Sequence, residues 1–150
     1  MSGNLVEVRS EVKSARAAKL ARQLEAWAHE FLLALKLREV AVSIVVVGDA
    51  RMTALNTQWR DKEKTTDVLS FPAGEPVGPG PRLLGDVAIC LPTAVRQAKA
   101  LGTSVDDEAR LYLAHGLLHL LGHDHQTKAD ERRMSLLERK LLTRAGMLAR

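Results

Sequence analysis

The amino-acid sequence predicts an α+β fold: a single domain, residues 1–150, with a four-stranded mixed sheet and about five helices packed on it. Three observations lead to this prediction. Short apolar runs alternate with longer segments of helical periodicity, in the order β-α-β-α-β-β-α-α-α. No internal repeat or long linker divides the chain. A histidine-rich segment near the C-terminus combines a helix with a glycine turn, and the other elements are expected to support it.

The first half of the chain supplies two strands and two helices. Leu5–Arg9 alternates weakly in polarity, as a short strand does. Ser14 precedes a long helix in which apolar residues recur every third or fourth position. Val40–Val47 is almost wholly apolar and β-branched, which predicts a central strand covered on both faces. Asp49 is expected to cap a helix that runs through Trp59.

Two strands follow a polar loop. Asp67–Phe71 has the pattern of a strand that Pro72 stops. Residues 74–82 are too rich in glycine and proline for regular structure. Leu84–Leu91 is the next strand, and its Gly85-Asp86 step predicts a bulge or a close backbone approach.

Three helices complete the chain. Pro92 suits the first turn of a helix that stops at Gly102. Ser104 is the expected start of the histidine-rich helix, because acidic residues occupy the following turn. Thr127 is the expected start of the last helix, which ends near Gly146.

Composition narrows the class of protein. The single cysteine, Cys90, excludes an internal disulfide and is expected to be a small buried side chain on a strand. No apolar run is long enough to span a membrane. Glu7 and Glu11 leave no room for a secretory signal, so a cytoplasmic location is expected. Phe, Trp and Tyr together number only five, which argues against an aromatic platform for base stacking.

Three of the four histidines in Leu113–His125 have the spacing of metal ligands. His115 and His119 are four residues apart and therefore share one face of a helix. Gly122 can end that helix with positive φ, and the returning chain would bring His125 to the first two. Three imidazoles with water in the fourth position form a catalytic zinc site. The spacing thus predicts a metal-binding helix-turn that holds one Zn²⁺ per chain.

An isolated histidine pair with this spacing more often belongs to a helix surface or a core than to a metal site. Here leucines surround His115 and His119, so the imidazoles are expected to be partly buried and to need polar partners. A metal shared with His125 supplies one. His123, between Gly122 and Asp124, is expected to face solvent.

The formal net charge of +4 permits a polyanionic partner without requiring one. Four cationic side chains, Arg51, Arg60, Lys62 and Lys64, lie close together in sequence. Residues 128–150 are also rich in lysine and arginine. For this C-terminal segment, the favoured interpretation is a solvated charged surface.

The histidine segment resembles the YbeY family: His115-Gly116-x-Leu118-His119-Leu120-x-Gly122-x-Asp124-His125 matches its H-G-x-L-H-L-x-G-x-D-H signature. The family often has tyrosine where this chain has Trp59 and His123, but neither residue is a proposed ligand. The resemblance covers about residues 48 to 126, and its further blocks are Asn56-x-x-Trp59-Arg60, Thr66-Asp67-Val68-Leu69-Ser70-Phe71-Pro72 and Leu84-Gly85-Asp86-Val87-Ala88-Ile89.

The resemblance implies a zinc-dependent endoribonuclease that prefers single-stranded RNA and acts in ribosomal RNA processing and ribosome maturation. Its catalytic residues here would be Arg60 and His115: zinc-bound water attacks the phosphodiester while Arg60 stabilises the phosphate. The alternative is that Arg60 caps the preceding helix. The expected partners are ribosomal RNA or ribosomal subunits, with Lys62, Lys64 and Arg82 adding contacts to the RNA backbone.

Two carboxylates are candidates to support the ligands. Asp124 precedes His125 and would accept a hydrogen bond from a ligand imidazole, or else cap the last helix or close the turn. Asp86 is a weaker candidate for the same role. Asp67 is expected to shape the turn into its strand.

Two alternative functions remain open at this stage. The histidine spacing is similar to the metzincin protease motif H-E-x-x-H-x-x-G-x-x-H, but Gly116 stands where that motif has its catalytic glutamate. The other alternative is a non-catalytic ribosome assembly factor with a structural zinc. Such a zinc has four protein ligands and would need Cys90 or Asp124.

Overall fold

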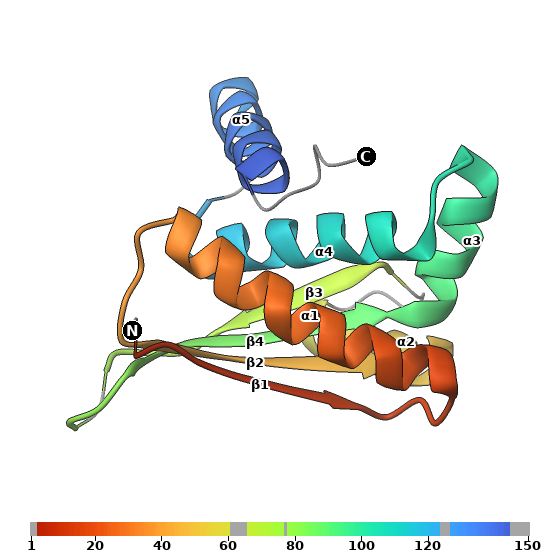
Figure 1. The fold of residues 1–150 in the computed structure, drawn as a ribbon, viewed down its shortest axis with the longest axis horizontal. Coiled ribbons are helices and arrows are strands. Elements are labelled where there is room, and N and C mark those ends of the chain that lie inside the picture. Colours follow the sequence, from red (N-terminus) through yellow and green to blue (C-terminus); the bar gives the residue numbers. More distant parts are fainter. Residues whose placement is uncertain (1–2, 61–65, 77, 124–126, 145–150) are drawn as a thin grey trace.

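The computed structural model describes residues 3–60, 66–76, 78–123 and 127–144, without the side chains of Arg60 and Arg144. It confirms the predicted α+β class and the order of the elements (Figure 1). Within these residues the elements are β1 (Leu5–Ser10), α1 (Ala15–Ala34), β2 (Val40–Val47), α2 (Asp49–Arg60), β3 (Val68–Pro72), β4 (Arg82–Cys90), α3 (Leu91–Leu101), α4 (Val105–Leu120) and α5 (Lys128–Arg144).

The four strands form one mixed sheet in the order β1-β2-β4-β3. β2 pairs in parallel with both β1 and β4, whereas β3 pairs with β4 antiparallel. β2 therefore has a neighbour on each side, as its apolar sequence predicts. Its last four residues are all buried, so this end of the strand is covered on both faces.

Different helices cover the two faces of the sheet. α1 and α4 pack on one face, where Phe31 of α1 and Leu117 of α4 are completely buried. On the other face Met52 of α2 packs with Val45 and Val47 in a smaller apolar cluster. α5 lies against α4 on the side away from the sheet (Figure 1). α4 is thus held between the sheet and α5.

The predicted helix boundaries are largely confirmed. The hydroxyl of Ser14 accepts a hydrogen bond from the amide of Ala17, and that of Ser104 accepts one from Asp107. Asp49 is the exception. α2 begins at Asp49 itself, and the carbonyl of Gly48 accepts the hydrogen bond from the amide of Met52. The Asp49 carboxylate is directed instead to Arg96 on α3.

The bulge expected at Gly85-Asp86 is present. The register between β2 and β4 shifts at this point, and Gly85 has a φ of 143°. A Cβ at this position would lie 2.3 Å from the carbonyl oxygen of Phe71 on β3, so a larger residue does not fit. Glycine therefore allows β3 and β4 to approach closely at the end of β3 nearest Pro72.

None of the helices in the described part of the chain is both long enough and apolar enough to cross a membrane.

Candidate functional site

α4 places His115 and His119 next to each other. Both rings are partly buried, their centroids are 4.5 Å apart, and their Nε2 atoms are 3.0 Å apart. The helix ends as predicted. Gly122 adopts a φ of 96°, and its amide donates to the carbonyl of His119. The amide of His123 donates to the carbonyl of Leu118, which closes the turn directly before Asp124 and His125.

A carboxylate from α5 contacts the first histidine. Oε1 of Glu138 lies 2.6 Å from Nδ1 of His115, a distance typical of a charge-assisted hydrogen bond. The Glu138 side chain is 17% exposed, so water screens this contact only weakly. When Nδ1–H donates to Glu138, Nε2 of His115 carries the free lone pair and faces His119.

The sequence analysis did not identify Glu138, although the sequence held a signal. Glu138 follows Met134 by four residues and precedes Leu141 by three, so all three share the face of α5 that packs inward. A carboxylate on an inward-facing apolar stripe needs a partner. His115 is that partner, and it lies 23 residues away in the sequence.

The imidazole pair fits a zinc ion. Two Zn–N bonds of about 2.0–2.1 Å at a tetrahedral angle place their nitrogens roughly 3.3 Å apart. The 3.0 Å between the two Nε2 atoms is close to this value. Carboxylates that accept from the second ring nitrogen commonly orient zinc-binding histidines, and Glu138 has this geometry toward His115.

The proposed third ligand, His125, lies outside the described residues, as do Asp124, Lys62 and Lys64. Within the described ranges there is no group of three or more His, Cys, Asp and Glu side chains suited to a metal. The prediction of a three-histidine site thus depends on His125.

Gly116 faces the sheet. A Cβ here would lie 2.8 Å from Cγ1 of Val87 and 3.2 Å from Oγ of Ser70, and that hydroxyl donates to the Gly116 carbonyl at 3.0 Å. The absence of a side chain therefore lets α4 pack closely against β3 and β4. In this fold, the position that carries the catalytic glutamate in metzincins is filled by strand side chains.

Asp86 does not support the two described histidines. Val87 faces α4, so its neighbour Asp86 points to the opposite face of the sheet. There it lines a groove of about 470 Å³ with Trp59, Phe71 and Arg51. The prediction that Asp86 orients a ligand imidazole is therefore incorrect for His115 and His119.

The structure places two of the predicted arginines only in part. Arg82 begins β4 and lines a hollow with Leu121 and Gly122, at the turn that leads toward His125. Arg60 is the last residue of α2, and its side chain lies outside the description. Arg82 is therefore near the histidine turn, whereas the role of Arg60 stays a prediction.

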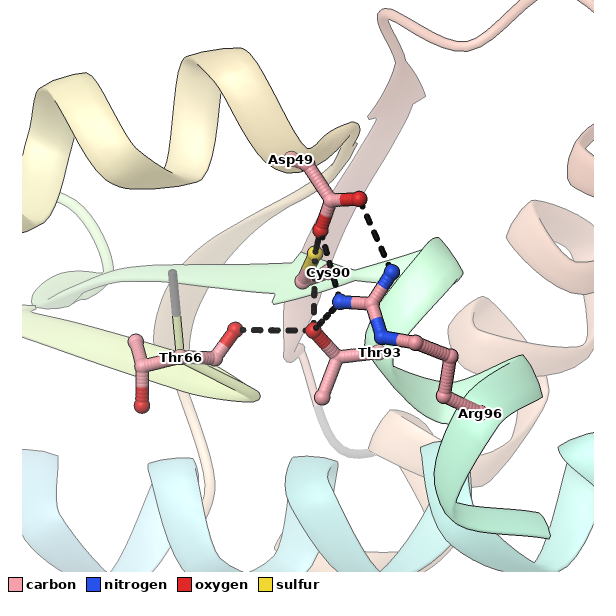
Figure 2. A network of polar contacts seen from close by, with 5 residues as sticks. All are labelled: Asp49, Thr66, Cys90, Thr93 and Arg96. Carbon is pink, nitrogen blue, oxygen red and sulfur yellow. Dashed lines mark hydrogen bonds and ion pairs between the residues drawn. The ribbon is translucent and has the colours of Figure 1, made fainter. Parts of the chain in front are cut away.

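A second polar cluster joins the first residues of α2 and α3 (Figure 2). The Asp49 carboxylate accepts two hydrogen bonds from Arg96, at 2.9 and 2.8 Å, and this pairing raises the pKa of Arg96. Arg96 also donates to Thr93, whose hydroxyl contacts the carbonyl of Thr66 and the completely buried thiol of Cys90. Cys90 is the small buried strand residue that was expected, and it is not grouped with the histidines.

The comparisons with known proteins agree with the residue-level description. The family model of endoribonuclease YbeY matches residues 5–146. An endoribonuclease YbeY of Myxococcus xanthus is 51% identical over 93% of this chain, which spans only 48% of that relative's length. One of Anaeromyxobacter sp. is 48% identical, with 94% of this chain and 73% of the relative covered.

A solved structure shares the fold. The solution structure of TM1509 from Thermotoga maritima superposes with a TM-score of 0.62 at 23% identity, over 93% of this chain and 90% of the other. At this identity the likeness establishes the fold alone. The family model and the Anaeromyxobacter relative carry the assignment: this chain belongs to the endoribonuclease YbeY family.

Proposed function

We propose that this protein is a zinc-dependent endoribonuclease of the cytoplasm that cleaves single-stranded RNA during ribosomal RNA processing and ribosome maturation. Membership of the endoribonuclease YbeY family supports hydrolysis of RNA. The single structural observation that carries the metal dependence is the convergence of two Nε2 atoms, 3.0 Å apart, with Glu138 at the first ring.

In this proposal His115, His119 and His125 hold the zinc, one ion per chain. Bound zinc supplies a Lewis acid that polarises a phosphoryl oxygen and makes a water molecule more acidic. Glu138 accepts the Nδ1 proton of His115 and thereby keeps Nε2 free for the metal. Arg60 is assigned to the developing negative charge on the phosphate, because a guanidinium binds two phosphate oxygens at once.

Two features oppose the alternative functions. A metzincin-like protease needs a glutamate that moves a proton to the leaving amine, and Gly116 is packed against Val87 and Ser70 with no room for one. A structural zinc with Cys90 as fourth ligand is opposed by the contacts of that thiol with Thr93 and Asp49.

The test is a cleavage assay with the purified chain on single-stranded and structured RNA of equal length. We expect cleavage that is faster on the single strand, disappears with a chelator and returns when zinc is restored. Casein serves as the control substrate and should remain intact. Casein cleavage that His115→Ala abolishes would make the protein a protease, and RNA cleavage that survives chelation would remove zinc from the mechanism.

A further inference from the structure

We propose that a basic face of α5, formed by Lys128, Arg132 and Arg139, binds the phosphodiester backbone of the RNA and positions the strand at the histidine site. The inference rests on the proposed function, since it concerns the same substrate. It replaces the sequence-based interpretation of this segment as a solvated surface.

α5 carries most of the excess charge of the protein. Its 17 residues include six Lys or Arg and three Asp or Glu, so α5 contributes +3 of the formal net charge of +4. At about 100° per residue, Lys128, Arg132 and Arg139 fall within roughly 40° of one another around the helix axis. All three are exposed. They form a single stripe, with side chains about 6 Å and then about 10 Å apart along the axis.

No carboxylate neutralises this stripe within the described residues. Other arginines of the molecule are paired: Arg96 with Asp49 at 2.8 Å, Arg51 with Glu11 at 3.5 Å. Arg133, elsewhere on α5, lies 3.9 Å from Asp130. Like charges four residues apart, as at Lys128 and Arg132, destabilise a helix slightly. A polyanion bound along the stripe would turn this repulsion into attraction.

The position of the stripe relative to the histidines selects the partner. Glu138 on the same helix contacts His115 directly, so α5 is fixed against the proposed metal ligands. Arg139 follows Glu138 and is rotated from it by about 100°, which places the stripe beside the inward face of α5 and not opposite it. A strand whose scissile phosphate lies at the histidine pair therefore has the basic face as its neighbour.

The experiment compares two double variants that remove the same charge. Arg132→Gln with Arg139→Gln removes two cations of the stripe. Lys19→Gln with Arg22→Gln removes two exposed cations from the first turns of α1, which lie at the end of α1 far from α5 (Figure 1). Single-turnover cleavage of a single-stranded RNA is measured against protein concentration at several salt concentrations. The half-saturating concentration reports binding and the plateau rate reports the chemical step.

We expect the α5 variant to keep its plateau rate and to require more protein for half saturation. Each phosphate contact on a single strand contributes about 0.7 to the slope of log affinity against log salt. Losing two contacts should lower that slope by about 1.4 and raise the half-saturating concentration roughly 25-fold at 0.1 M salt. Arg132→Lys with Arg139→Lys should restore most of the binding, because charge is what the backbone recognises.

Two results would overturn the inference in distinguishable ways. If the native chain cleaves RNA and the α5 variant has the same half-saturating concentration and salt slope as the α1 variant, the basic face is wrong and the proposed function survives. If the native chain cleaves no RNA, both fall together.

Discussion

The molecule contains two polar clusters that use similar residue types in opposite ways. In the cluster of Asp49 and Arg96, the carboxylate accepts from the guanidinium at 2.8–2.9 Å, so charges of opposite sign neutralise each other. In the cluster of His115 and His119, a carboxylate fixes one imidazole and leaves two ring nitrogens 3.0 Å apart. The first arrangement joins two helices, whereas the second has the donor geometry of a cation site.

The difference shows that the density of polar side chains does not identify a site in this protein. What separates the clusters is whether hydrogen-bond donors and acceptors balance. Arg96 supplies the donors that Asp49 needs. Two imidazoles with their Nε2 atoms together have an excess of acceptors, which a metal ion satisfies. Each prediction below breaks one side of this comparison.

The largest effect is expected from Gly116→Glu, which pushes a carboxylate between α4 and the sheet. Its Cβ would already lie 2.8 Å from Val87, so overpacking costs about 1–3 kcal/mol. A buried carboxylate without a partner adds several kcal/mol. Together these approach the total stability of a typical domain, about 5–15 kcal/mol. Thermal unfolding should show a largely unfolded chain, whereas Gly74→Glu, where nothing lies within 4 Å, should fold normally. A native melting curve for Gly116→Glu would contradict the close packing of α4.

Arg60→Ala is expected to lower the cleavage rate by about 10²–10³, because one transition-state donor is lost. Zinc content and circular dichroism should be unchanged. Arg96→Ala is the matched control: it removes a guanidinium from the paired cluster and should leave the rate unaltered. Near-normal cleavage by Arg60→Ala would assign Arg60 to the end of its helix instead.

Glu138→Ala is expected to weaken zinc binding by about 10–100-fold, because His115 loses the acceptor that orients its ring. Competition with a chromophoric chelator measures this affinity. Glu131→Ala on the exposed side of α5 is the control and should bind zinc like the native chain. Equal affinities for the two variants would show that the Glu138 contact does not serve the metal.

Asp49→Asn should have the smallest effect. The Asp49 and Arg96 side chains are 46% and 53% exposed, so solvent screens their pairing and its loss lowers the unfolding midpoint only slightly. Zinc content and RNA cleavage should stay at native levels. A loss of zinc in this variant would mean that the two clusters are coupled.

Local signals were sufficient to predict most of the fold. Ser104 caps α4, and Pro92 and Gly102 bound α3, because each acts through contacts within a few residues of itself. The apolar sequence of Val40–Val47 correctly placed that strand inside the sheet, since only a strand covered on both faces tolerates such a run.

The pairing of distant side chains was not predictable in the same way. Glu138 and His115 meet because α5 packs on α4, which depends on tertiary structure and not on spacing. Asp86 was misplaced for a related reason. Its face is set by strand register and by the bulge at Gly85, and a shift of one residue reverses every side chain of a strand.

The central claim is that His115 and His119 hold a zinc required for RNA cleavage. Its most direct test is elemental analysis of purified native chain and of His119→Ala, with cleavage of single-stranded RNA measured on the same samples. We expect one zinc per native chain, and in His119→Ala no zinc, no cleavage and a lower unfolding midpoint, because metal binding contributes to folding free energy. Full zinc occupancy in His119→Ala, or undiminished cleavage by a metal-free chain, would contradict the claim.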